Sequence, residues 1–287
     1  MTRARLAPAK VNLFLHVGPL QADGYHPLAS WMVFADVGDE LRLEPAPSWS
    51  FEARGPFAPD LGDGENLVEA AARKLFERAD IAAPPLKLVL DKRLPVAAGL
   101  GGGSSDAGAA LRLLNAELPT PLATTDLTAI AAELGADGPA CLQAASVVAL
   151  GRGDRLQPAP RMAPLPAVLV NPRKPSFTGA VYRAYDGGAP AEADLPAMPE
   201  AFAAPAEVAA WLGARRNDLE APALSLEPEI GDVLEWLRTQ PETLFARMSG
   251  SGATCFVLCR EVPEAESLAA RLAADRPEWW GVNCLLG

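Results

Sequence analysis

The segment 95–106 reads Pro-Val-Ala-Ala-Gly-Leu-Gly-Gly-Gly-Ser-Ser-Asp and lies between an apolar strand pattern and an apolar helix pattern. Glycine lets the main chain adopt positive φ angles and bring N–H groups close to an anion, and a helix that begins directly afterwards adds the positive end of its dipole. The segment therefore predicts a loop that binds a nucleotide phosphate. A glycine-rich turn without a ligand is the alternative interpretation.

Two common nucleotide-binding motifs do not match this segment. A Walker loop needs Gly-Lys-Ser or Gly-Lys-Thr, which does not occur here. A dinucleotide-binding fingerprint needs a different glycine spacing and an acidic residue about 20 positions further on, at the end of a second strand. The sequence therefore argues against a nicotinamide-dependent dehydrogenase.

Length and charge limit the classes of partner. The 287 residues suffice for two medium-sized lobes with a buried core. The formal net charge of −11 argues against nucleic acid or an anionic membrane as a partner, because both are bound through clustered Lys and Arg. No apolar run approaches the roughly 18 residues of a membrane span. A small anionic ligand would need a local positive field from a few lysines, main-chain amides and helix ends.

The N-terminus and the cysteines indicate a cytoplasmic protein. The start of the chain is basic, as in a signal peptide, but Lys10 and Asn12 interrupt the apolar stretch that should follow. The cysteines have neither metal-ligand spacing nor the density of a secreted scaffold. We expect them to be reduced core residues: Cys141, Cys255, Cys259 and Cys284.

Apolar periodicity predicts a lobe of strands and helices around the glycine loop. Residues 9–17 alternate as in a strand, which places Lys10 and Asn12 on the same face. The helix after the loop has Ser104 or Ser105 available as its N-cap. The other expected elements are strands at 31–36 and 40–44 joined by a Gly38-Asp39 turn, a helix at 66–79, a strand at 86–91, a helix from about Asp126 to Gly135, and a short helix that begins at Pro139. Asp137 then lies beside a helix N-terminus, where a carboxylate is favoured by about 0.3 to 1 kcal/mol.

A segment rich in Gly, Pro and Arg, 151–166, predicts the crossover to a second lobe, so we expect domains at 1–155 and 156–287. The second lobe has strand patterns at 167–171, 243–248, 254–259 and 282–286, and helix patterns at 178–185, 230–238 and 264–274. The Ala/Pro-rich stretch 186–206 supports no prediction of its own. We therefore expect an α/β fold of the α+β type, with mixed and antiparallel sheets.

The loop at Pro95 to Ser105 resembles the phosphate loop of the galactokinase, homoserine kinase, mevalonate kinase and phosphomevalonate kinase superfamily, which reads Pro-x-x-x-Gly-Leu-Gly-Ser/Gly-Ser-Ser; this chain has one glycine more before the two serines. Within it, further motifs are similar to those of the 4-diphosphocytidyl-2-C-methyl-D-erythritol kinases. They lie at 8–15, 22–26, 91–95, 135–137 and 248–253. The resemblance spans almost the whole chain, apart from 186–215.

The resemblance implies a two-lobed kinase fold with the active site in the cleft between the lobes. It implies ATP and Mg²⁺ as cofactors and phosphorylation of the 2-hydroxyl of 4-diphosphocytidyl-2-C-methyl-D-erythritol, a step of non-mevalonate isoprenoid synthesis. The partner would be this small cytidine diphosphate compound, with the protein a monomer or a homodimer. A sister kinase for mevalonate or homoserine is one alternative, and a nucleotide-binding sensor without catalysis is another.

The resemblance also implies roles for individual residues. Asp137 is the candidate general base, and Lys10 would favour its ionised form and polarise the substrate hydroxyl. The residues expected to bind ATP are Asn66, Lys92, Pro95, Gly99, Leu100, Gly101, Gly102, Gly103, Ser104 and Ser105. The residues expected to bind the alcohol substrate are Asn12, Tyr25, His26, Asp137, Tyr182, Gly250, Ser251 and Gly252. Ser105 is the candidate Mg²⁺ ligand.

Plain structural interpretations compete with several of these roles. Lys10 and Asn12 would otherwise form a solvated strand face, and Asp137 a turn residue. Tyr182 would otherwise pack on the core, and Asn66 would cap a helix. One departure from the relatives is Gly138, where they usually have an apolar residue; it is expected to loosen the placement of Asp137.

Overall fold

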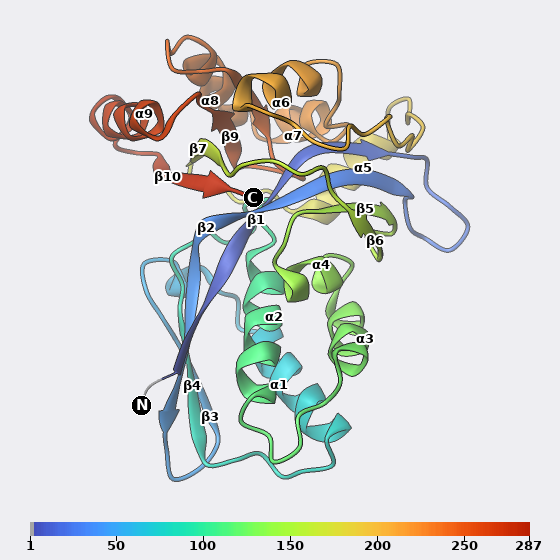
Figure 1. Ribbon diagram of the computed structural model, residues 1–287, viewed down its shortest axis with the longest axis vertical. Coiled ribbons are helices and arrows are strands. Elements are labelled where there is room, and N and C mark those ends of the chain that lie inside the picture. Colours follow the sequence, from blue (N-terminus) through green and yellow to red (C-terminus); the bar gives the residue numbers. More distant parts are fainter. Residues whose placement is uncertain (1–2) are drawn as a thin grey trace. The chain divides into compact units, whose positions relative to one another are not determined.

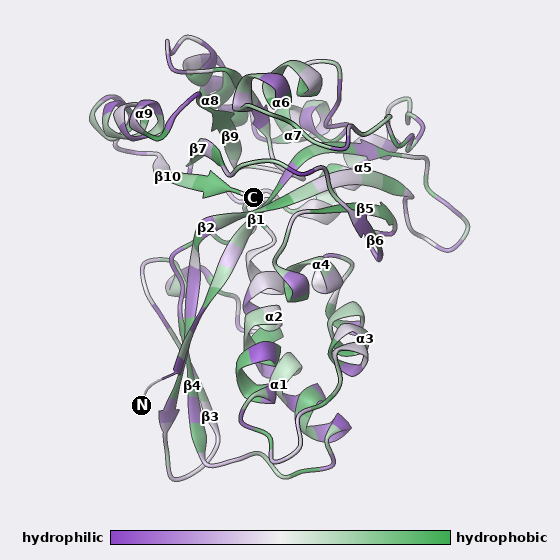
Figure 2. Cartoon of the chain, in the orientation of Figure 1, coloured by the Kyte–Doolittle hydropathy of each residue, from purple (hydrophilic) through white to green (hydrophobic). Residues whose placement is uncertain are grey.

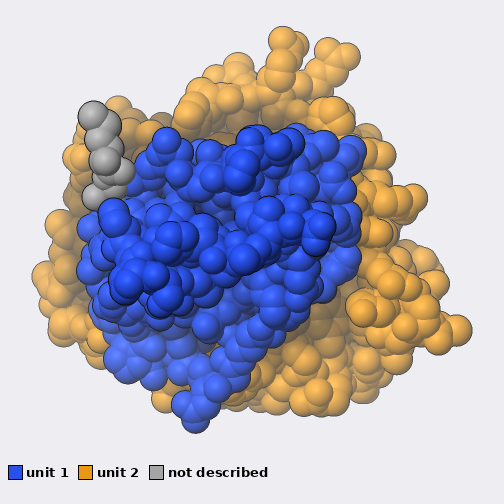
Figure 3. Space-filling model, turned by 90° about the horizontal axis from the view of Figure 1, so that it is seen from below, with its two compact units in different colours: residues 1–10, 37–96, 101–144 blue, residues 11–36, 97–100, 145–287 orange. Residues whose placement is uncertain are grey.

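The computed structural model describes residues 3–287, which divide into two units that each combine separate stretches of chain (Figure 3). Unit 1 contains the residues up to 10, 37–96 and 101–144, and unit 2 contains 11–36, 97–100 and 145–287. The chain therefore passes between the units several times. The predicted single boundary between residues 155 and 156 differs from this division, because two long N-terminal strands run through both units.

Unit 1 consists of a sheet and a group of helices (Figure 1). Strand β4 (Leu86–Asp91) pairs antiparallel with the second half of β2 (Leu28–Pro45) and parallel with β3 (Ser50–Arg54), while β1 (Arg3–Val17) pairs with β2. The helices are α1 (Leu67–Arg78), α2 (Gly102–Asn115), α3 (Thr124–Leu134) and α4 (Gly138–Gln143), with a short 3-10 helix at Ala58–Asp60. Leu75, Leu88 and Leu111 lie fully buried where the helices meet the sheet.

Unit 2 is built on an antiparallel sheet in the order β10 (Trp280–Leu286), β7 (Leu165–Asn171), β9 (Cys255–Leu258) and β8 (Phe245–Met248). Every residue of β7 and β9 is buried, and β9 is strongly hydrophobic in Figure 2. The first half of β2 pairs with β5 (Val147–Gly151), which forms a hairpin with β6 (Arg155–Pro158). The helices are α5 (Thr178–Asp186), α6 (Pro205–Leu212), α7 (Glu220–Leu226), α8 (Glu229–Arg238) and α9 (Val262–Asp275).

The predicted mixed α/β architecture is confirmed, as are most element positions. The Gly38-Asp39 turn is wrong, because β2 continues through it. A Cβ atom at Gly38 would lie 2.0 Å from the carbonyl oxygen of Ala7, so glycine is needed for the close approach of the two strands. The expected crossover at 151–166 contains strand β6, and helices α6 and α7 were not predicted. Among residues 3–287, no helix combines the length and hydropathy required to cross a bilayer.

The expected N-cap of the helix after the glycine loop is also wrong. Gly101, in the left-handed conformation, caps α2, so the helix begins at Gly102 and Ser104 and Ser105 lie in its first turn. Glycine forms this cap because it adopts a positive φ without strain. The four cysteines are buried and free, as expected, and burial raises the pKa of Cys141 to about 12.

Three charged side chains are buried together in unit 1. The ammonium of Lys92 donates to Asp39 Oδ2 at 2.5 Å and to Asp106 Oδ2 at 2.9 Å, and these side chains are at most 3% exposed. Burial raises the pKa of Asp106 to about 7; the Lys92 charge opposes this rise and the Asp39 charge adds to it. Burial alone would lower the pKa of Lys92, but the two carboxylates outweigh it and the pKa is raised.

Asp106 should make the stability of the protein depend on pH with a definite sign. Its pKa is higher in the folded state than the ordinary value of 3.8, so between about pH 4 and pH 7 the folded state holds a proton that the unfolded state lacks. The contribution of Asp106 to the free energy of unfolding therefore falls as pH rises through this window. Asp106→Asn does not titrate, so its free energy of unfolding relative to the parent should rise from about pH 4 to pH 7 in urea unfolding.

Glu242→Gln serves as the control with the opposite sign. The Arg271 guanidinium, 2.7 Å from Glu242, holds the pKa of that carboxyl below its usual value. The contribution of Glu242 to the free energy of unfolding is present above the pKa that this carboxyl has in the unfolded chain. It is lost as pH falls through the lower pKa of the folded state. The variant should therefore lose stability relative to the parent as pH rises. A pH-independent difference for Asp106→Asn would contradict the raised pKa.

Candidate active site

Lys10 and Asp137 form an ion pair in unit 1, as the sequence predicts. Lys10 Nζ lies 3.0 Å from Asp137 Oδ2; the lysine side chain is 6% exposed and that of the aspartate 31%. Strand β1 supplies Lys10, and Asp137 is the N-cap residue of α4. The ammonium is thus enclosed, while the carboxylate remains open to a ligand.

Gly138 tightens the position of Asp137 rather than loosening it. A Cβ atom at Gly138 would lie 1.9 Å from the carbonyl oxygen of Ala131, so the backbones of α3 and α4 are in direct contact here. Its N–H also donates to the carbonyl of Gly135 at 2.9 Å. The turn that presents Asp137 is therefore held from both sides.

The glycine loop has the backbone geometry of an anion-binding site. Gly99 and Gly101 have φ angles of +73° and +60°, and α2 begins directly after them. The N–H groups in the first turn of a helix have no intrahelical acceptor, and they carry the positive end of its dipole. Gly102, Gly103 and Ser104 are at least partly exposed in this turn. A Cβ atom at Gly101 would lie 3.0 Å from Lys10 Cε, so Lys10 lies directly against the loop within unit 1.

In unit 2, the predicted substrate-binding turn 249–252 packs on the other part of the glycine loop. The Ser249 hydroxyl donates to the carbonyl of Gly99 at 3.0 Å and accepts from the Asn12 N–H at 3.1 Å. A Cβ atom at Gly99 would lie 2.4 Å from the carbonyl oxygen of Ser249. Asn12 is buried and donates from Nδ2 to the Ser30 hydroxyl at 2.7 Å. Asn12 and this turn therefore support the shape of the loop.

The same turn is also held by α5 and the residues before it. The Ser176 hydroxyl donates to the carbonyl of Ser251 at 2.6 Å, and the hydroxyls of Thr178 and Ser251 are 2.9 Å apart. Gly250 and Gly252 flank Ser251 with φ angles of +57° and +79°. Sequence reasoning missed Ser176 and Thr178, which lie far from the turn in the sequence.

The three ring-bearing residues among those predicted to bind the alcohol substrate separate into two groups within unit 2. The rings of His26 and Tyr182 lie 4.9 Å apart at an angle of 34°, and Tyr185 meets His26 edge-on at 5.9 Å. His26 Nδ1 donates to the carbonyl of Gly18 at 2.9 Å, and its Nε2 lies 3.4 Å from Asp186 Oδ1. Tyr25 is instead 52% exposed, beneath the guanidinium of Arg152 at 4.2 Å.

Tyr185 and Asp186 belong with the His26 group and were missed. They follow Tyr182 by three and four residues, so all three side chains lie on one face of α5. This helical spacing is the sequence signal that could have identified them. Tyr25 does not share this group: the guanidinium of Arg152, which also pairs with Asp23, lies over its ring.

Several predicted ATP-binding residues have structural roles. Asn66 is the N-cap of α1, and its side chain accepts a hydrogen bond from the Val68 N–H at 2.9 Å. This helix cap is the structural role that competed with ATP binding in the sequence analysis. Pro95 and Leu100 are buried, so their side chains are not available to a ligand. Lys92 is buried between Asp39 and Asp106, two carboxylates that sequence reasoning missed.

The Mg²⁺ site expected at Ser105 does not fit the structure. Ser105 is fully buried in the first turn of α2, whereas Mg²⁺ in proteins usually keeps several waters and is bound through one or two carboxylates and the substrate phosphates. No group of three or more His, Cys, Asp or Glu able to hold a metal occurs in the part of the chain that the structure describes. Ser104, one residue earlier, is the partly exposed hydroxyl in this turn.

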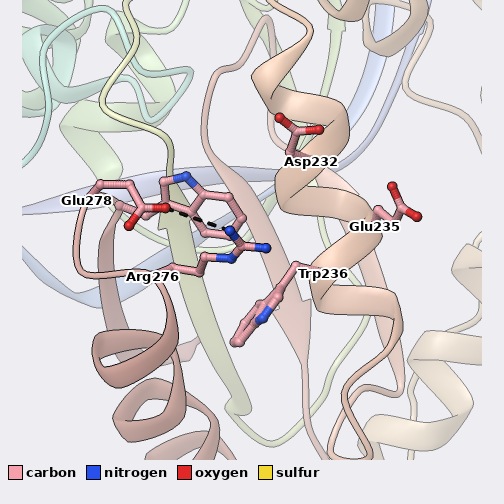
Figure 4. A pocket seen from close by; sticks show the side chains of 6 residues that line it. Asp232, Glu235, Trp236, Arg276 and Glu278 are labelled. Atoms are coloured by element: carbon pink, nitrogen blue, oxygen red, sulfur yellow. Dashed lines mark ion pairs between the residues drawn. The ribbon is translucent and has the colours of Figure 1, made fainter.

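A separate hollow of about 500 Å³ lies in unit 2, at α8 and the turn between α9 and β10 (Figure 4). It is lined by Asp232, Glu235, Trp236, Arg276, Glu278 and Trp279. None of the predicted site residues lines it. Arg276 lies over the ring of Trp279 at 5.1 Å and within 4.0 Å of Glu278.

Comparison with known proteins identifies the family. Residues 66–147 match the GHMP kinases N terminal domain, and residues 196–277 match the GHMP kinases C terminal domain. A 4-diphosphocytidyl-2-C-methyl-D-erythritol kinase of Caulobacter vibrioides (strain NA1000 / CB15N) is 57% identical over 289 residues, which cover 100% of both chains. A protein of the same name from Hyphomonas neptunium is 48% identical, covering 98% of this chain and 95% of that one.

Solved structures agree. A crystal structure of 4-(cytidine 5'-diphospho)-2C-methyl-D-erythritol kinase matches with a TM-score of 0.79 at 35% identity, covering 99% of both chains. The mevalonate kinase of L. major shares the fold, with a TM-score of 0.69 at 16% identity over 99% of this chain and 96% of that one. The chain belongs to the GHMP kinases and, within them, to the family of 4-diphosphocytidyl-2-C-methyl-D-erythritol kinases.

Proposed function

We propose that this kinase transfers the γ-phosphoryl group of ATP to the 2-hydroxyl of 4-diphosphocytidyl-2-C-methyl-D-erythritol. The observation that carries the proposal is the Lys10–Asp137 ion pair beside Gly101, in a chain that is 57% identical to a relative of that name. A carboxylate, an ammonium and an anion-binding helix end are the groups that phosphoryl transfer to an alcohol requires.

In this mechanism, Asp137 is the general base. Its carboxylate accepts the hydroxyl proton of the substrate as the hydroxyl oxygen bonds to the γ-phosphorus. The bond between the γ-phosphorus and the oxygen that bridges to the β-phosphate breaks, and ADP leaves with that electron pair. Lys10, which is almost fully enclosed, holds the carboxylate in place and stabilises the negative charge on the attacking oxygen.

The glycine loop provides the contacts to the triphosphate. The N–H groups of Gly102, Gly103 and Ser104 in the first turn of α2 would donate to phosphate oxygens, aided by the helix dipole. When bound, Mg²⁺ would neutralise phosphate charge. We assign it no ligand in this chain, because Ser105 does not fit that role.

The His26 and Tyr182 rings are the proposed contact for the cytosine base. Aromatic faces stack on nucleobases, and Asp186 beside His26 adds a hydrogen-bond acceptor. The proposed enzyme works on a small molecule in the cytoplasm, as a monomer or a homodimer; its location and its oligomeric state remain predictions.

The first test is alcohol specificity. Purified protein with ATP should release ADP when 4-diphosphocytidyl-2-C-methyl-D-erythritol is added, and should release far less with mevalonate or homoserine. ADP release with mevalonate or homoserine alone would identify a sister kinase. ATP binding without turnover on any of these alcohols would identify a nucleotide sensor.

Asp137→Asn should abolish most of the turnover while leaving the fold and ATP binding intact. Asparagine has nearly the same shape, and the Asp137 side chain makes no capping hydrogen bond that could be lost, but an amide cannot act as a general base. Loss of a general base lowers kcat by about 10² to 10⁴. The matched control is Asp126→Asn. Asp126 lies on α3 in an exposed ion pair with Arg78 of α1, so this variant should keep the parental kcat. Parental turnover in Asp137→Asn would remove this residue from the mechanism.

His26→Ala and Tyr182→Ala should weaken binding of the alcohol substrate without affecting ATP. Stacking contributes about 1 to 3 kcal/mol per base, so the KM for the cytidine compound should rise about 5-fold or more. Tyr25→Ala removes an aromatic ring of the same type from an exposed site and should change this KM by only about twofold. If Tyr25→Ala has the larger effect, the base binds at the Arg152 side instead.

A further inference from the structure

Two carboxylates and one lysine connect the segments on either side of the glycine loop. Asp39 lies on β2, Lys92 directly follows β4, and Asp106 lies in α2. Lys92 precedes the loop and Asp106 follows it, and both belong to unit 1. The ion cluster therefore joins the entry of the loop to its exit across 14 residues of sequence.

Asp39 fixes the entry of the loop. Its Oδ1 accepts from the main-chain N–H groups of Arg93 at 2.6 Å and Leu94 at 2.8 Å, while its Oδ2 accepts from Lys92. These contacts occupy both carboxylate oxygens, and the side chain has no exposed surface. Three successive residues before the loop are thus attached to one point on β2.

Lys92 carries this attachment to the exit of the loop. Its Nζ donates to Asp106 at 2.9 Å, and it would lie 3.0 Å from a Cβ atom at Gly102, the first residue of α2. An ammonium beside a helix N-terminus opposes the helix dipole, so Lys92 is unfavourable here without its carboxylates.

Burial of this cluster is an unfavourable way to stabilise a fold. Removing charged side chains from water has a large free-energy cost, and well-packed apolar side chains often give equal or greater stability. Its position at both ends of the phosphate-binding loop suggests a role in shaping that loop.

We propose that Asp39 is a positioning residue for ATP: through Lys92 and two main-chain N–H groups, it holds the glycine loop in its phosphate-binding shape before the nucleotide arrives. The proposal rests on the proposed function only in taking ATP as the ligand of the loop. ATP affinity can be measured without the alcohol substrate, so failure of one proposal does not imply failure of the other.

Two isosteric variants separate positioning from a general effect of buried charge. In Asp39→Asn, the amide oxygen has to face the N–H groups of Arg93 and Leu94, so the amide NH₂ meets the Lys92 ammonium and that hydrogen bond is lost. In Asp106→Asn, the amide oxygen can keep the hydrogen bond from Lys92. The NH₂ group can then occupy the position of Asp106 Oδ1, which has no hydrogen-bond partner in the parent. Above its pKa of about 7, Asp106 is mostly ionised, so in that pH range both variants remove one buried negative charge.

Asp39→Asn should raise the Kd for ATP, measured by calorimetry, and the KM for ATP by about tenfold, the effect of losing one charge-assisted hydrogen bond. The KM for the alcohol should stay within about twofold of the parent. Asp106→Asn should keep near-parental values, and so should Glu242→Gln, which breaks an ion pair in unit 2. A parental ATP affinity in folded Asp39→Asn, or equal losses in Asp39→Asn and Asp106→Asn, would overturn the proposal.

Hydrogen exchange on the parent protein tests the proposal even if Asp39→Asn does not fold. The main-chain N–H groups of Arg93 and Leu94 should be protected from exchange without nucleotide, because Asp39 already binds them. Protection that appears only after addition of a non-hydrolysable ATP analogue would show that the nucleotide, not Asp39, shapes this segment, and would contradict the proposal.

Discussion

The proposed active site of this kinase depends on main chain in the left-handed conformation at Gly99 and Gly101. These two residues turn the chain so that α2 begins with unsatisfied N–H groups, and the absence of a Cβ allows close packing at both positions. At Gly101 the space is occupied by the Lys10 side chain, and at Gly99 by the main chain of the 249–252 turn. A side chain at either position would displace a neighbour that contributes to the site.

Electrostatics explains how an acidic protein can hold a polyanion. The chain carries a net charge of −11, so a favourable field must be local. In the proposed function, the first turn of α2 and the enclosed Lys10 supply it. Lys92, the other lysine near the loop, is neutralised by Asp39 and Asp106, and acts on the loop through hydrogen bonds instead of through an exposed charge.

Several features could be predicted because they follow from local patterns. Period-two alternation located β1 with Lys10 and Asn12 on it, and helical periodicity with a glycine stop located α3 and the turn that carries Asp137. The predictions failed where a distant neighbour changed the meaning of a local signal. Gly38-Asp39 has the composition of a turn, but the backbone of Ala7 requires that glycine inside a strand, and the Asp39 carboxylate binds residues more than 50 positions away.

The sequence by itself determined where the glycine loop, the ammonium at 10 and the carboxylate at 137 stand in the chain, and its motifs carried the resemblance to the family. Residue type and short-range spacing suffice to locate the loop and the two charged groups. Only the tertiary structure decided that Ser105 faces the interior, that His26 pairs with Tyr182 and not with Tyr25, and that Asp39 holds the loop. Those outcomes depend on which surfaces become buried together, and the burial of a polar side chain is set by partners that are remote in sequence.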